Sequence, residues 1–304
     1  MASSFNSGRI VQSFVTAFAD ANSLASRAMP IVQAPGASSY KVGGAALGGT
    51  AATLSATATS LAASDAFSYE SSHSMVQKVV KHTIPLNTLQ TDYALDAAGQ
   101  GMADSIMAAL DKLGFDGLEG LFAAAHPREG AGAGQVGAAN QYYLDASLAY
   151  LQGEGGAGSN ANLLTSALDE SALNNAIKLM IGYRNDRGHP MHLGANGGLV
   201  LVVAPKNAQI AHELVKSQLS GADMASNFVT NLISDIVVWP FTTDDDDWFL
   251  IHKTKCPVGL AVAEMPTVEV NTSDDGLFVH IVGKFTACFF KSPYEYGIVG
   301  SNVA

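Results

Sequence analysis

A long apolar repeat that begins near residue 92 sets the strongest limit on the fold of this chain. Apolar residues recur every three to four positions from Leu95 to Leu113, the spacing of one face of an α-helix. A helix over Asp92 to Leu113 is a rod of roughly 33 Å at about 1.5 Å per residue, which is long for a globular enzyme and suits the spine of an elongated molecule. The side chains predicted to form its buried face are Leu95, Met102, Ile106, Leu110 and Leu113.

The expected boundaries of this helix follow from its flanking residues. Asn87 or Thr91 provides an N-cap, because a short polar side chain accepts a hydrogen bond from the first free backbone N–H groups. Gly114 is expected to end the helix, because glycine is the usual residue after a helix C-terminus.

The chain carries little charge for its length. Charged residues make up 14% of the 304 residues and hydrophobic residues 48%, against roughly 25% charged in an ordinary soluble domain. We therefore expect much of the surface to be covered by copies of the same chain. The net charge of -11 disfavours tight general binding to nucleic acid or to an anionic membrane. The same charge is compatible with a protein shell that encloses DNA without binding it tightly.

The first 41 residues are locally basic within this acidic protein. They carry Arg9, Arg27 and Lys41 against the single acid Asp20. Apolar residues at helical spacing predict a short amphipathic helix, and two prolines prevent its continuation. These apolar residues and prolines are Ile10, Phe14, Phe18, Pro30 and Pro35. We expect an arm whose basic side chains contact a neighbouring subunit.

The segment from Val42 to Ser64 contains no charge and consists almost wholly of small residues with leucine. Composition alone is equally typical of a disordered linker. Residues Met75 to Ile84 follow with a strand-like pattern, however, which favours a long two-stranded loop. We expect Leu47 and Leu54 to anchor the tip of this loop on a neighbouring subunit.

The rest of the chain alternates a helix–strand–helix lobe with a strand-rich end. Asp169 is expected to cap a helix that closes near Gly188, and the continuous apolar run Leu199 to Ala204 predicts a strand covered on both faces. Pro205 then opens a second helix. The later predicted strands are Ile236 to Trp239, Trp248 to Lys253, Val258 to Ala263, Thr267 to Asn271, Leu277 to Val282 and Phe285 to Lys291.

Few residues offer chemistry, and no catalytic, cofactor-binding or metal-binding residue is predicted. His212-Glu213 matches the start of a zinc-protease motif, but position 216 is a lysine, so the second ligand is missing. The acidic run Asp244 to Asp247 offers oxygen ligands to a divalent cation, although a solvated turn is the favoured interpretation. The remaining candidates are expected to be structural: the turn histidines His189 and His192, the reduced thiols Cys256 and Cys288, and the aromatic residues of Phe285 to Phe290 and Tyr294 to Tyr296.

Several of these segments resemble the Mu-type major head subunit family, whose members have the Hong Kong 97 fold of phage capsids. The resemblance is carried by Tyr183 to Pro190, Leu199 to Pro205, Asp247 to Leu250 and Lys291 to Tyr294. It implies an α+β fold with an N-terminal arm, an extended β-hairpin loop, a peripheral domain with the long spine helix, and an axial domain. The corresponding segments are 1–41 for the arm, 42–85 for the loop, 86–164 with 254–304 for the peripheral domain, and 165–253 for the axial domain.

The resemblance also implies a function. It predicts the major capsid protein of a tailed bacteriophage, without enzymatic activity or cofactor, which self-assembles in the host bacterial cytoplasm. Hexamers and pentamers then form the icosahedral shell of a virion around double-stranded DNA. The implied partners are a portal, a separate scaffolding protein and, in some members, a decoration protein, with no membrane. Some members crosslink their loops through lysine, but residues 42–77 contain none.

Three other classes of protein stay open. An encapsulin-like shell shares the fold and packages enzyme cargo. A soluble enzyme with an unrecognised site would be monomeric and bind a metal or a small ligand. A tail-tube protein is a weaker alternative, because tubes are mostly β and have little use for a long spine helix.

Overall fold

The computed structural model describes most of the chain. No helix in the part that it describes is both long and apolar enough to cross a membrane. The described residues are 6–20, 23–46, 67–126, 142–153, 156–185, 190–216, 219–220, 225–226, 229–240, 242 and 244–303.

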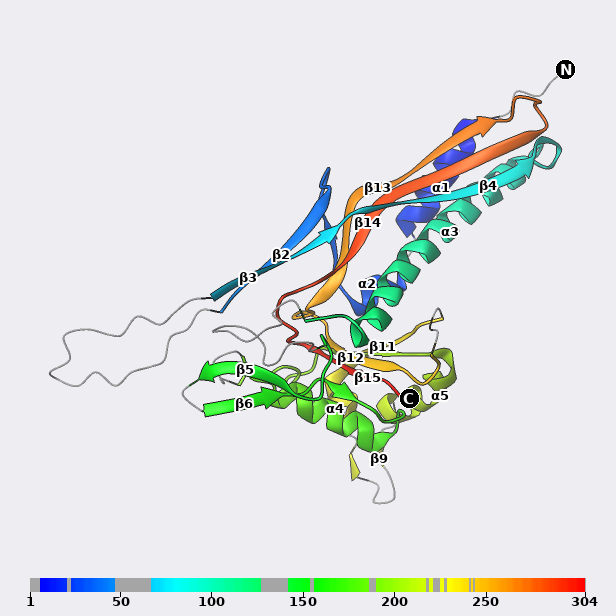
Figure 1. The fold of residues 1–304 in the computed structure, drawn as a ribbon. Helices are drawn as coiled ribbons and strands as arrows, with labels where there is room; N and C mark the ends of the chain where they lie inside the picture. Colours follow the sequence, from blue (N-terminus) through cyan, green and yellow to red (C-terminus); the bar gives the residue numbers. More distant parts are fainter. Residues whose placement is uncertain are drawn as a thin grey trace.

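An elongated unit combines a four-stranded sheet with three helices (Figure 1). The strands follow the order β1-β13-β14-β4, antiparallel except for the parallel pair β1 and β13. Helix α3 runs along this sheet, and α1 lies against α3. The elements are α1 (Ser7–Asp20), α2 (Leu24–Ala28), β1 (Ile31–Gln33), β4 (Val76–Pro85), η1 (Leu86–Thr88), α3 (Asp92–Glu119), η2 (Gly120–Phe122), β13 (Val258–Thr272) and β14 (Phe278–Lys291).

The sheet buries one face against α3 because its apolar residues alternate. Along β14, Val279, Ile281, Phe285 and Ala287 are all buried and belong to the same apolar core as Met102 and Ile106 of α3. Gly283 completes this face, since a Cβ atom there would lie 2.4 Å from Ile106 Cδ1. Helix and sheet therefore approach closely at that point.

A second unit is built on a five-stranded sheet of order β11-β8-β12-β15-β7. Leu199, Leu201 and Val203 of β8 face a core with α4 and α5, while Val200 and Val202 face the core shared with α3. The expected strand is therefore confirmed as covered on both faces. The elements are β7 (Leu163–Leu164), α4 (Glu170–Gly182), β8 (Leu199–Val203), η3 (Pro205–Asn207), α5 (Ala208–Lys216), α6 (Val229–Leu232), β11 (Ile233–Val238), β12 (Trp248–His252) and β15 (Ile298–Ser301).

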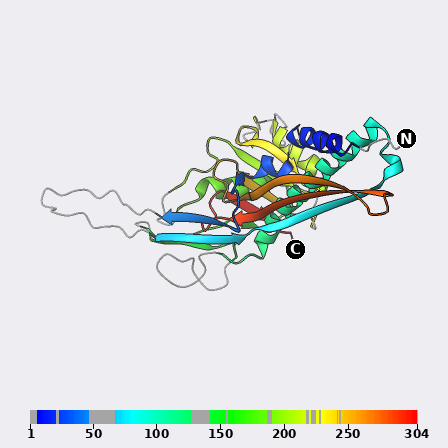
Figure 2. The same cartoon turned by 90° about the horizontal axis from the view of Figure 1, so that it is seen from above.

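In the described part of the chain, three two-stranded pairs lie outside the two larger sheets (Figures 1 and 2). Strands β2 (Ser39–Ala46) and β3 (Phe67–Ser74) pair antiparallel and lead away from the body. Strands β5 (Leu148–Gly153) and β6 (Gly156–Asn160) form a second antiparallel pair, and β9 (Leu219–Ser220) pairs with β10 (Ala225–Ser226). The chain thus has an elongated sheet, a second lobe and a projecting β2–β3 hairpin.

Two predicted helix ends are wrong. The spine helix begins after its expected cap Thr91, whose side chain accepts a hydrogen bond from Ala94 N, but it continues through Gly114 to Glu119. Gly114 stays helical because it is packed, with an added Cβ atom 3.2 Å from Ala25 Cβ. Helix α4 is capped by Asp169 as expected and ends at Gly182, well before Gly188.

The C-terminal strands are longer than expected. The two predicted segments from Val258 to Asn271 are one strand, β13, with irregular pairing near Glu264. Those from Leu277 to Lys291 are likewise one strand, β14. A bulge shifts the register of the two strands without ending their hydrogen-bonded pairing. In the sequence, the alternation of apolar and polar residues is interrupted at the bulge, so one strand is predicted as two. Strand β15 was not predicted, and it adds to the second sheet a strand from outside residues 165–253.

Candidate assembly surfaces

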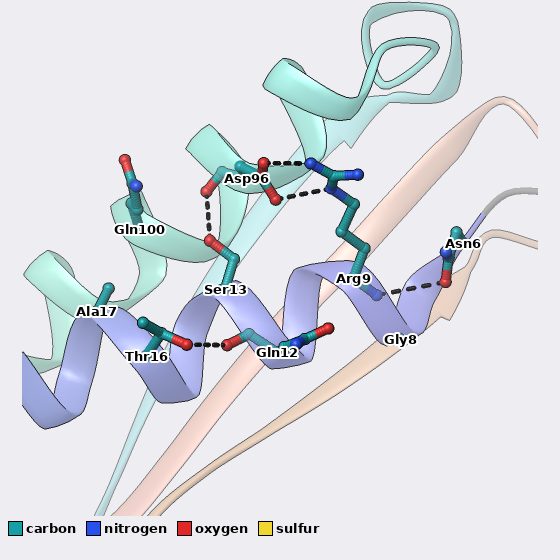
Figure 3. A pocket seen from close by; sticks show the side chains of 9 residues that line it. All are labelled: Asn6, Gly8, Arg9, Gln12, Ser13, Thr16, Ala17, Asp96 and Gln100. Atoms are coloured by element: carbon teal, nitrogen blue, oxygen red, sulfur yellow. Dashed lines mark hydrogen bonds and ion pairs between the residues drawn. The ribbon is translucent and has the colours of Figure 1, made fainter.

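Arg9 joins α1 to α3. Its Nε and Nη2 atoms lie 2.8 and 2.6 Å from the two carboxylate oxygens of Asp96, and Nη1 lies 2.8 Å from Asp92 Oδ2. The hydrogen bonds from Arg9 lower the pKa of Asp96. Figure 3 shows this pair beside a polar hollow of about 770 Å³ between the two helices. Arg9, expected to reach a neighbour, therefore has two carboxylate partners within its own chain.

Arg27 connects the two units of the molecule. It lies on α2, and its Nη2 and Nε atoms donate to the carboxylate of Asp235 on β11 over 2.7 and 3.0 Å. A further hydrogen bond reaches Ile236 O at 3.0 Å. Hydrogen bonding to Arg27 lowers the pKa of Asp235. In the single chain this arginine links the N-terminal segment to the second lobe.

Helix α2 is held to the spine helix by a buried carboxylate. Asp111 accepts hydrogen bonds from Ser23 Oγ at 2.5 Å and from Ala25 N at 2.9 Å. It thereby satisfies a free N–H group at the start of α2. The sequence reading did not single out this residue, because an acid within an apolar helical repeat is usually on its solvent face.

The remaining sequence-predicted residues divide into three groups. Leu95, Met102, Ile106 and Leu110 are buried and Leu113 is partly buried against the same core, so the spine stripe is internal framework. Lys41 lies exposed on β2. Leu47 and Leu54 lie outside the described residues.

Several large apolar side chains are exposed. Tyr93 in the first turn of α3 is 83% exposed and Leu277 is 62% exposed. Leu277 directly precedes β14, and the first residue of β14, Phe278, pairs with Pro85 at the end of β4. Leu277 and the first turn of α3 therefore lie at the distal end of the elongated sheet, which is the end away from the second sheet (Figure 1). Among the described residues, the other large exposed apolar side chains are Val15, Val76, Val79, Tyr142, Ile210, Met265 and Phe278. A sequence pattern cannot reveal them, because the same residue types also form the core.

The root of the β2–β3 hairpin is fixed to the end of β14 by side chains. Ser71 Oγ donates to Lys291 O over 2.5 Å, and Lys291 N donates to His73 Nε2 over 3.2 Å. Beside these bonds, the rings of Tyr40 and Phe290 lie 4.9 Å apart. We call Ser71, His73 and the main chain of Lys291 the hairpin clamp.

The sequence-predicted chemical candidates do not gather into a site. His212 and Glu213 are exposed on α5, and His192 is exposed with a left-handed φ of 51°. His189 lies outside the described residues. In the acidic run, Asp246 pairs with Lys206 at 2.7 Å. Within the part of the chain that the structure describes, no three His, Cys, Asp or Glu side chains are placed to hold a metal ion.

Two further acids are buried against expectation: Asp247, which was expected in a solvated turn, and Glu295, which the sequence pattern did not single out. Asp247 is 3% exposed, and burial together with nearby Asp244 and Glu119 raises its pKa to about 7. Glu295 is also buried, and it accepts hydrogen bonds from Tyr183 Oη at 3.1 Å and pairs with His126 Nε2 at 2.9 Å. Burial raises the pKa of Tyr183 well above its ordinary value. These groups join segments that are distant in sequence, so no local spacing could have found them.

Neither cysteine forms a disulfide; Cys288 is buried and Cys256 is partly buried. Cys256 and Cys288 are free cysteines, and burial raises the pKa of Cys256 to about 12. A thiol with so high a pKa is almost wholly protonated at neutral pH and is therefore a poor nucleophile.

Comparisons with known proteins find likeness in structure alone. No family model matches the sequence, and no curated protein matches it either. Solved structures match over nearly the whole chain. The capsid of a native GTA particle matches with a TM-score of 0.56 and 14% identity, covering 93% of this chain and 91% of that one. The mature capsid of bacteriophage PhiM1 matches with a TM-score of 0.56 and 10% identity, covering 93% and 88%.

A third match has a different source. A virus-like particle from Pyrococcus furiosus matches with a TM-score of 0.52 and 11% identity, covering 97% of this chain and 98% of that one. At these identities the likeness concerns the fold. The chain therefore has the α+β Hong Kong 97 fold of phage capsid proteins.

Proposed function

We propose that the chain is the major capsid protein of a tailed bacteriophage and has a structural role without catalysis. It assembles into hexamers and pentamers of an icosahedral shell that encloses double-stranded DNA. The observation that carries this proposal is the match of nearly the whole chain to chains from a mature phage capsid and a GTA capsid. A match over a single lobe would have supported only a shared domain.

The exposed apolar surface and the low charge support self-assembly. A monomer that leaves groups such as Leu277 and Tyr93 in water gains about 25 cal/mol for each Å² of apolar area that a neighbour covers. In a closed shell the same contact recurs at many equivalent interfaces, so modest burial per copy is sufficient.

Within this proposal the projecting hairpin is a contact between subunits. Its paired strands lead away from their own body (Figure 1), which supports a contact between the loop that joins them and another copy. Leu47 and Leu54 anchor the tip there, with Lys41 at its root. Arg9 and Arg27 add contacts to a neighbour at the exposed parts of their side chains, beside the carboxylates that they already bind. The division into arm, loop, peripheral and axial domains is part of the same proposal.

The narrower elements of the proposal rest on the sequence resemblance. They are membership of the Mu-type major head subunit family, assembly in the bacterial cytoplasm, and the need for a portal and a separate scaffolding protein, with a decoration protein as an optional partner. Co-expression tests them directly. We expect closed shells of uniform size only when the chain is produced with the scaffolding protein of the same phage.

Negative-stain microscopy and size-exclusion chromatography of the purified chain test the function itself. We expect rings of five or six copies, or closed shells, in fractions far larger than the 304-residue monomer. Substituting Leu47 and Leu54 together by Asn should lower the yield of shells while the circular dichroism spectrum stays unchanged. A chain that elutes as a monomer at all concentrations, with and without scaffold, contradicts the proposal.

A second candidate is a shell that packages protein cargo. The match to a virus-like particle from Pyrococcus furiosus, which covers 98% of that chain, favours it. The contents of purified shells separate the two candidates. Nuclease-protected DNA supports the phage capsid, whereas a co-purifying enzyme in the absence of DNA supports the cargo shell.

A further inference from the structure

The hairpin clamp lies where the regular pairing of the elongated sheet stops. The ladder between β4 and β14 ends at the pair Val76 and Ala287, although β14 continues to Lys291. At Met75 the chain leaves this ladder and continues into the hairpin. Beyond that point side chains of β3 take the place of a paired strand and bind the main-chain groups of Lys291. The direction of the hairpin therefore depends on a few side-chain contacts.

One hydrogen bond of the clamp, from Lys291 N, depends on an unprotonated His73 Nε2 atom. Ser71 Oγ donates to Lys291 O, and the Nε2 atom of His73 lies 3.2 Å from the Lys291 N–H group and 3.0 Å from Lys291 O. An unprotonated Nε2 accepts from Lys291 N, so both main-chain groups of Lys291 are satisfied. A protonated Nε2 can still donate to Lys291 O, which accepts two hydrogen bonds, but it removes the acceptor that the clamp offers to Lys291 N and adds a positive charge near the Lys291 ammonium.

The surroundings also disfavour a charge on His73. The ring is half-buried, and desolvation is the main reason why its pKa is lowered. The hydrogen bond to the Lys291 carbonyl opposes this shift, and the Lys291 ammonium adds to it. That ammonium is held in place because it donates to Ala125 O over 2.6 Å. The other titratable groups of the packed elements are Cys288 on β14, which faces the carbonyl of His73 at 3.9 Å, and Tyr40 across the pair on β2. In the described residues around the ring, no carboxylate contact offsets the cost of the charge.

We propose that the hairpin clamp is a proton-sensitive device: neutral His73 fixes the direction of the β2–β3 hairpin, and protonation of His73 frees the hairpin from the end of β14. That the hairpin clamp regulates the contact between the β2–β3 hairpin and a neighbouring subunit rests on the proposed function. Since the clamped state disfavours the proton, the clamp is complete above the ordinary histidine pKa of about 6.5 and weakens as the pH falls below it.

Hydrogen exchange measured by mass spectrometry on the full-length chain tests the clamp. Peptides from β2 and β3 are compared at about pH 7.5 and about pH 5, corrected for the intrinsic exchange rate. We expect the protection of both strands to fall severalfold at the lower pH in the natural chain. His73→Gln keeps an acceptor but does not titrate, so its protection should stay high at both values. His73→Ala should be weakly protected at both.

The matched control is His280→Gln, which changes a histidine on the same sheet whose ring bonds Thr83 and not the clamp. It should behave like the natural chain. A pH-independent hairpin in the natural chain, or the same loss of protection in His73→Gln, overturns the clamp even if His73→Ala fails to fold. Microscopy of the same samples separates this result from the proposed function. Shells with a pH-independent hairpin refute only the clamp, whereas a pH-dependent hairpin without shells refutes only the capsid.

Discussion

Asp247 is a residue whose properties the fold alters strongly. Its carboxyl group is buried next to the acids Asp244 and Glu119, and its Oδ1 atom has no hydrogen-bond partner. Its pKa therefore rises from 3.8 to about 7. The folded chain binds a proton that the unfolded chain releases above about pH 4, so the free energy of unfolding decreases as the pH rises from about 4 through 7. The decrease amounts to about 4 kcal/mol at most.

We expect Asp247→Asn to raise the free energy of unfolding at about pH 8 by about 2–4 kcal/mol and to flatten its dependence on pH between about 5 and 8. Denaturant titrations at several pH values measure both effects. The control is Asp246→Asn, which removes a partly exposed acid paired with Lys206. If both variants keep the pH dependence of the natural chain, Asp247 is ionised throughout this range.

At the scale of elements, the packing of α1 on α3 depends on one glycine. A Cβ atom at Gly99 would lie 2.6 Å from Ile10 O and 2.9 Å from Phe14 N, so the backbone of α1 occupies the space of a side chain. Ile10 and Phe14 are buried in this contact. The amphipathic helix of the N-terminal segment is thus part of the core of its own chain, and Arg9 adds ion pairs at its rim.

Gly99→Ala should lower the free energy of unfolding by about 1–3 kcal/mol, because backbone atoms cannot rotate away from the new methyl group. Hydrogen exchange should also show α1 losing protection before α3 does. Gly101→Ala on the same helix is the control, since its Cβ atom would meet nothing within 4 Å. It should raise the free energy of unfolding by about 0.5–1 kcal/mol through helix propensity. Equal effects of the two substitutions would exclude the close contact.

At the scale of the whole molecule, the two units are joined by shared core and by Arg27. Val200 and Phe249 of the second sheet pack in the same core as Phe115 of the spine helix. The Arg27–Asp235 pair lies at the edge of this junction and is partly exposed. An exposed pair contributes about 0.2–1 kcal/mol to stability. The pair therefore adds little to the free energy of unfolding.

Arg27→Glu should lower the free energy of unfolding by about 1 kcal/mol or less, and it should lower the yield of shells if orientation matters for assembly. The exchanged double variant Arg27→Glu with Asp235→Arg restores the pair within the chain. Recovery of shell yield in the double variant assigns Arg27 to the intramolecular contact. Continued loss assigns it to a contact with a neighbouring copy.

The distal end of the molecule offers a separate test of assembly. Leu277→Asp should reduce the yield of shells because it places a charge on an apolar contact, while the melting temperature changes little at so exposed a position. Asn271→Asp, an exposed polar residue on the adjoining strand β13, adds the same charge as a control. Normal shell yield from Leu277→Asp would show that this end stays in solvent.

The sequence determined the elements whose apolar residues repeat locally. The spine helix from Thr91, the buried strand β8 and the helix capped by Asp169 follow from spacing and capping within one segment. The low content of charged residues indicated a surface that copies of the same chain cover. The order of the predicted helices and strands along the chain indicated the fold. These properties depend on neighbours in the chain, and such neighbours are visible in a sequence.

The tertiary structure alone decided the contacts between distant segments. The spine helix continues through Gly114 because Ala25 and Leu260 pack against this residue. Strand β13 continues through its bulge because β14 pairs with it both before and after the irregular residues. The raised pKa of Asp247 and the bonds of His73 to Lys291 likewise depend on residues far away in the chain. Burial and hydrogen bonding across such separations arise only when the chain is folded, so local spacing carries no record of them.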